Sequence, residues 1–133
     1  MIDYRLGGSN VRRAGGTSRG EEDMVWFLVR FQFNSASAKS IITSPQDRLG
    51  PATTLVESFG GRLHDYFFAF GDFDGVIIAE FPDHKAAAAF SLRANATGGF
   101  SRFEMTVLIP TTEAEAAMKQ ARDIKLVYRA PNE

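Results

Sequence analysis

Four segments of this chain alternate apolar and polar residues in the manner of β-strands, and their order constrains the fold more than any other feature. The four are residues 24–33, 62–70, 74–81 and 100–109. Helical patterns fill the first and third intervals between them, whereas a short turn joins the middle two. The order predicts an α+β fold of the ferredoxin-like βαββαβ type. Its four-stranded antiparallel sheet would carry helices on one face and leave the other face open.

The first helical interval contains a break. Ser44 followed by Pro45 is typical of a helix start, with serine at the N-cap and proline at the first helical position. Pro51 then lies inside the expected helix, where a proline costs about 3 kcal/mol. We therefore expect a kink or restart near Gly50, and a short helical stretch within residues 35–43.

The second helical interval and the C-terminus have clearer signals. Asp83 is a natural N-cap, and Gly98 follows the last residues of helical character. Residues 112–115 match a capping box and predict an extra C-terminal helix that ends near Arg122. Residues 124–128 alternate and predict a short edge strand.

The chain divides at Met24. Residues 1–23 are rich in glycine and lack hydrophobic periodicity, so we expect a flexible tail. Residues 20–23 are what a purine-rich ribosome-binding site would give if it were translated, which suggests that Met24 is the true initiator. Residues 24–133 then form one domain. No secretory signal or bilayer-spanning run is evident, and the protein is expected to be cytoplasmic, without a membrane partner.

Composition excludes several classes of function. Fifteen basic and sixteen acidic residues leave a charge of −1, which disfavours a general nucleic-acid binder. The chain has no cysteine, which excludes disulfides and thiolate metal sites. His64 and His84 are the only histidines, and no further ligands converge on them in the sequence. We therefore expect neither a metal nor a cofactor.

The open face of the predicted sheet is the main candidate for function. Strand alternation places Trp26 and Leu28 on it, with Arg30, Arg102 and Glu104 among the polar residues. An apolar patch edged by charges is typical of a protein interface, so Trp26 and Leu28 are predicted to lie in a homodimer interface.

A ligand pocket on the same face is the competing interpretation. It requires His64 and Tyr66 to share the face with Arg30, Arg102 and Glu104. The two arginines would then hold a carboxylate or phenolate, and His64 would accept a proton. The alternative is that the arginines form cross-strand ion pairs with Glu80 and Glu104, worth about 0.2–1 kcal/mol each.

Residues 67–83, followed by four alanines at 86–89, resemble the GYD domain family. The namesake motif appears as Gly71-Asp72-Phe73-Asp74, with phenylalanine in place of tyrosine. The resemblance implies a small bacterial ferredoxin-like protein that forms dimeric α/β barrels. It implies no defined activity.

These observations favour a homo-oligomer, with a dimer as the first expectation, that binds a small molecule or serves in assembly. One alternative is a cofactor-independent oxygenase or isomerase of the dimeric α/β-barrel type. The other is a purely structural interaction protein. The expected partners are a second copy of the chain and a small-molecule ligand.

Overall fold

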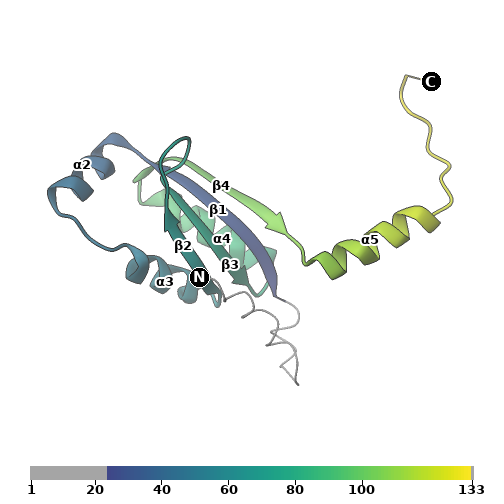
Figure 1. Cartoon of the computed structure of the whole chain (residues 1–133), viewed down its shortest axis with the longest axis horizontal. Coiled ribbons are helices and arrows are strands. Elements are labelled where there is room, and N and C mark those ends of the chain that lie inside the picture. The colour runs from purple at the N-terminus through teal and green to yellow at the C-terminus, as the bar shows by residue number, and fades with distance from the viewer. Residues whose placement is uncertain (1–23, 133) are drawn as a thin grey trace.

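The computed structural model describes residues 24–132 of the 133-residue chain (Figure 1). The predicted tail at residues 1–23 lies outside the described residues. The elements in chain order are β1 (Val25–Phe33), α2 (Ser35–Thr43), α3 (Leu49–Ser58), β2 (Arg62–Phe68), β3 (Gly75–Phe81), α4 (His84–Ala96), β4 (Phe100–Leu108) and α5 (Thr111–Asp123).

The four predicted strands are confirmed and form one antiparallel sheet in the order β2-β3-β1-β4. The fold is therefore α+β, as predicted. The element order is β-α-α-β-β-α-β-α, so α2 is an addition to the expected βαββαβ arrangement, beside the expected extra helix α5. Among the described helices, none has the length and apolar character that crossing a bilayer requires.

The predicted helix start at Ser44 is wrong, whereas the predicted restart near Gly50 is confirmed. Residues 44–48 are not helical, and α3 begins at Leu49 with Arg48 at its N-cap. Pro51 thus occupies the first turn of α3, where the missing N–H has no intrahelical partner to lose. The chain avoids an interior proline by ending α2 at Thr43.

The α4 boundaries are confirmed, because the Asp83 carboxylate accepts a hydrogen bond from the Ala86 N–H at 2.8 Å.

Of the C-terminal predictions, the extra helix is confirmed, whereas the capping box and the edge strand are wrong. α5 exists, but it starts directly after Pro110 without a side-chain cap, so the predicted capping box is wrong. Residues 124–128 form no strand, because this segment follows α5 away from the sheet edge (Figure 1).

The core lies between the sheet and the helices α3 and α4. It contains alternate residues of the two central strands, packed against one residue of α3 and two of α4. These are Phe27, Val29, Phe31, Ile77, Ala79, Phe81, Val56, Ala87 and Phe90. Both helices lie over this face, and the remaining face of the sheet, called here the open face, is uncovered by the described helices (Figure 1).

Candidate functional site

The open face has an apolar centre with charged ends. Strand register aligns its residues in rows across β2, β3, β1 and β4. One row is Arg62, Glu80, Trp26 and Leu108; the next is Asp65, Ile78, Leu28 and Thr106; the third is Phe67, Val76, Arg30 and Glu104. Trp26 and Leu28, the predicted interface residues, therefore lie at the middle of this face beside Ile78.

His64 and Tyr66 lie on opposite faces of the sheet, so the expectation that both share the open face is wrong. The pairing of β2 with β3 shifts register between Leu63 and Asp65, where His64 is the extra residue. A one-residue slip reverses which face each later side chain occupies. Tyr66 consequently pairs opposite the core residue Ile77 and lies under the helices.

His64 belongs to a compact cluster on the open face. Its Nε2 lies 3.0 Å from Oε1 of Glu80, and its ring stacks on Trp26 with 4.5 Å between centroids. Arg62 Nη1 is 3.9 Å from the same oxygen. Glu80 is only 4% exposed. A buried carboxylate needs such partners, because leaving an isolated charge away from water is costly.

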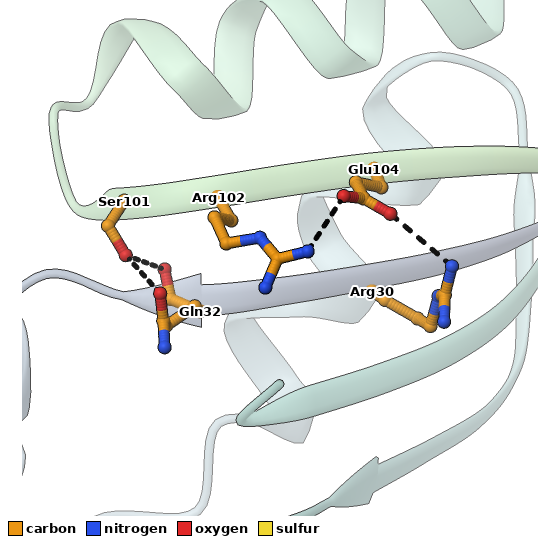
Figure 2. A network of polar contacts seen from close by, with 5 residues as sticks. All are labelled: Arg30, Gln32, Ser101, Arg102 and Glu104. Carbon is orange, nitrogen blue, oxygen red and sulfur yellow. Dashed lines mark hydrogen bonds and ion pairs between the residues drawn. The ribbon is translucent and has the colours of Figure 1, made fainter. Parts of the chain in front are cut away.

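The predicted arginines lie together on the open face, as Figure 2 shows, but both are already paired. Arg30 Nη2 donates to one oxygen of Glu104 at 3.3 Å, and Arg102 Nη2 donates to the other at 3.1 Å. Beside them, the Ser101 hydroxyl donates to Gln32 Oε1. These contacts favour the ion-pair interpretation for Arg30, Arg102 and Glu104. Glu80, in contrast, pairs with His64 and Arg62.

Phe73 is the residue that the sequence interpretation missed at this network. Its ring lies 4.6 Å from the Arg30 guanidinium carbon and 4.4 Å from that of Arg102. Each contact is a cation–π interaction. The signal was present in the Gly71–Asp74 motif, where an apolar ring occupies a turn that otherwise consists of glycine and aspartate.

The rest of that motif holds the β2–β3 turn against the end of β1. The Asp74 carboxylate accepts from the Phe33 N–H at 2.9 Å, and the Asp74 N–H donates to the Phe31 carbonyl at 2.8 Å. The next residue, Gly75, has no room for a side chain, because a Cβ there would lie 2.2 Å from Phe31 Cζ. The turn is therefore a structural clasp that also delivers Phe73 to the open face.

Tyr66 borders two adjoining cavities on the helix-covered face. The outer cavity measures about 350 Å³ and the inner one about 90 Å³. Phe33, Arg48 and Tyr66 line both. Burial raises the pKa of the Tyr66 phenol above 10.0, while the charge of Arg48 lowers it and that of Asp47 raises it. The phenol is therefore neutral at physiological pH and able to donate a hydrogen bond.

Arg48 is the second residue that the sequence interpretation missed. Its Nη1 donates to Gln46 Oε1 at 2.6 Å, and no acidic side chain in the described part of the chain forms an ion pair with it. The signal was the polar run of residues 46–48, which lies just before Pro51 and marks the break between two helices.

Three solved structures resemble the chain at low identity. The crystal structure of MtbAldR matches at 15% identity and a TM-score of 0.48, over 80% of this chain and 66% of that one. A NIPSNAP-like domain protein from Burkholderia xenovorans matches at 19% and 0.41, over 66% and 85%. A protein of unknown function from Nitrosomonas europaea matches at 19% and 0.37, over 65% and 90%. At these values the similarities carry no argument about function.

A search among curated proteins finds no matching sequence. The GYD domain family model matches residues 27–118, from the middle of β1 to the middle of α5. This span includes β2, β3, β4, the β2–β3 clasp and all of β1 except Val25 and Trp26, and it confirms the resemblance seen in the sequence. The chain therefore belongs to the GYD domain family.

Proposed function

We propose that this GYD domain is an assembly domain that pairs with a second copy of itself through the open face. The observation that supports the proposal most directly is the apolar centre of that face. Leu28 and Ile78 lie side by side on neighbouring central strands, and Trp26 and Val76 extend the patch along them. The described helices leave these residues uncovered.

The chemistry of the open face suits a copy of the same chain. Its edges carry both signs of charge, with Arg62 and Asp65 on β2 and with Arg102 and Glu104 on β4. A two-fold interface brings one surface against itself, so a patch that contains both signs can be self-complementary. Paired charges at the edge around an apolar centre are also what interfaces display.

The test is the solution mass of the full chain, measured by light scattering during size-exclusion chromatography. We expect a mass of twice 14.6 kDa for the natural chain. Leu28→Arg places a charge at the centre of the open face and should give the single-chain mass. Leu92→Arg is the matched control, because Leu92 is an exposed apolar residue of α4.

The natural chain eluting as a monomer at high concentration would contradict the proposal. So would a dimer that both variants leave intact, because the interface would then lie elsewhere. Circular dichroism of Leu28→Arg establishes that the variant is folded before its mass is interpreted.

A further inference from the structure

The helix-covered face contains a cavity that the assembly proposal does not use. Besides Tyr66, five phenylalanines line its inner part of about 90 Å³: Phe31, Phe33, Phe90, Phe100 and Phe103. It adjoins the outer part, of about 350 Å³, through the residues that line both. The outer volume alone is in the range of pockets that hold small molecules.

Two hydrogen-bond donors, the Tyr66 hydroxyl and the Arg48 guanidinium, line both parts of the cavity. Neither has an acidic partner among the described residues. The Tyr66 hydroxyl makes no hydrogen bond to any residue that the structure describes, although the ring is half-buried against Phe31 at 6.0 Å. The hydroxyl oxygen keeps contact with solvent, so a bound molecule can reach it. Arg48, the second group, donates only to the neutral amide of Gln46 within that same part of the chain.

Among the residues that the structure describes, Asp47 is the one acid that lines the outer cavity, and its carboxylate already accepts a hydrogen bond. Its Oδ1 accepts from the Leu49 N–H at 2.9 Å, at the start of α3. The guanidinium of Arg48 forms no ion pair with it within the described residues. The cavity thus offers a cation and a neutral hydroxyl donor beside an apolar, ring-lined interior.

From this arrangement we infer that the cavity binds a small aromatic carboxylic acid. The edge of its ring system enters the inner part, where phenylalanines offer edge-to-face contacts. The outer part has room for the remainder of the ligand. The carboxylate lies between Arg48, which supplies a charge-assisted hydrogen bond, and the Tyr66 hydroxyl, which donates a second. The cavity lies on the opposite side of the sheet from the proposed dimer interface, so the inference does not depend on assembly.

The experiment compares 2-naphthoate with the neutral 2-naphthamide, which have the same ring system. Both are titrated into the full chain by calorimetry, and amide chemical shifts are followed by NMR. The carboxylate should bind about ten-fold more tightly than the amide, because a charge-assisted hydrogen bond is about twice as strong as a neutral one. Shifts should concentrate at Ala52 and Leu55 of α3, which line the inner part.

Variants then test each group. Arg48→Gln should remove the preference for the carboxylate, and Tyr66→Phe should weaken its binding by a few-fold, on the order of one hydrogen bond. Asp47→Asn should strengthen it, because a like charge is removed. Arg93→Gln is the matched control: Arg93 is an exposed arginine in the last turn of α4 and lines neither part of the cavity.

Several results would overturn the inference. These are no saturable binding, equal binding of the two probes, or shifts that centre on Leu28 and Ile78. Another is occupation of the cavity by the C-terminal segment of a second copy, which a chain ending at Asp123 would reveal by gaining naphthoate binding that the full chain lacks. If Leu28→Arg is monomeric and still binds naphthoate, the two proposals are shown to be independent.

Discussion

Arginines lie near aromatic rings on both faces of the sheet, but the partners of these arginines differ between the two faces. On the open face, Arg30 and Arg102 share Glu104 and enclose the ring of Phe73. On the helix-covered face, Arg48 has only an amide partner in the described chain, next to a tyrosine hydroxyl that has none. Each guanidinium of the open face thus has a carboxylate partner, although the buried Nε of Arg30 makes no hydrogen bond, whereas Arg48 has no carboxylate partner among the described residues.

This difference indicates that the open face suits assembly and that the cavity on the other face suits ligand binding. Charges that are already paired can enter an interface without being left isolated, because their partners move with them. Donors around a cavity that lack a protein partner, in contrast, can exchange water for a bound molecule. On the open face, the arginines predicted to hold a ligand already have Glu104 as a partner.

The largest effect is expected at Gly75, next to the clasp that holds the β2–β3 turn against the end of β1. Gly75→Ala places a methyl group 2.2 Å from the Phe31 ring and should lower the free energy of unfolding by about 3 kcal/mol, as overpacking in a core does. Urea denaturation measures it. Gly50→Ala is the control, because a Cβ there meets nothing within 4 Å, and it should leave stability unchanged or raise it. Equal effects of the two substitutions would show that the clash is relieved by repacking.

His64→Ala should have the next largest effect, because it removes the closest partner of the buried Glu80 carboxylate. A loss of about 2 kcal/mol in the free energy of unfolding is expected for such an unsatisfied buried group. In the double variant with Glu80→Gln the buried charge is gone, so the loss should be less than the sum of the two single losses. Additive losses would mean that the 3.0 Å contact contributes nothing.

Glu104→Gln should cost much less, although Glu104 joins two arginines. The side chains of Arg30 and Glu104 are 37% and 44% exposed, and ion pairs of this exposure contribute about 0.5 kcal/mol. The same denaturation experiment in about 1 M salt should remove most of the difference, because the Debye length falls to about 3 Å. A loss that persists in salt would indicate that Phe73 and Arg30 depend on Glu104 for their packing.

The smallest effect is a pH dependence from Tyr66. Burial raises the pKa of this phenol above 10.0 in the folded chain, so the unfolded chain loses the proton first as pH rises. The contribution of Tyr66 to the free energy of unfolding should therefore be constant below pH 10 and fall above it, and Tyr66→Phe should abolish this contribution. Arg48→Gln should delay ionisation further, which ultraviolet titration of the phenolate can detect. A phenolate that appears at the ordinary pH would show that the ring is not buried.

The candidate site was only partly predictable. Trp26, Leu28, Arg30 and Glu104 were placed on the correct face because β1 and β4 alternate without interruption there. Tyr66 was misplaced because one extra residue in β2 reversed the face of everything after it. Arg48 has no periodic pattern, and its importance follows only from the cavity that α3 and β2 enclose.

The sequence by itself determined the α+β class, the four strands and the helices that cover one face, because these follow from local periodicity and from residues with strong conformational preferences. Asp83, Gly98 and the alternation of β1 are examples in which nearest neighbours settle the structure. Only the tertiary structure decided which faces His64 and Tyr66 occupy and which side chains pair with Glu80. It also decided that Arg48 borders the cavity without an acidic partner among the described residues. Each depends on strand register or on segments distant in the chain, and a shift of one residue, which barely alters local energies, exchanges the two faces of a strand.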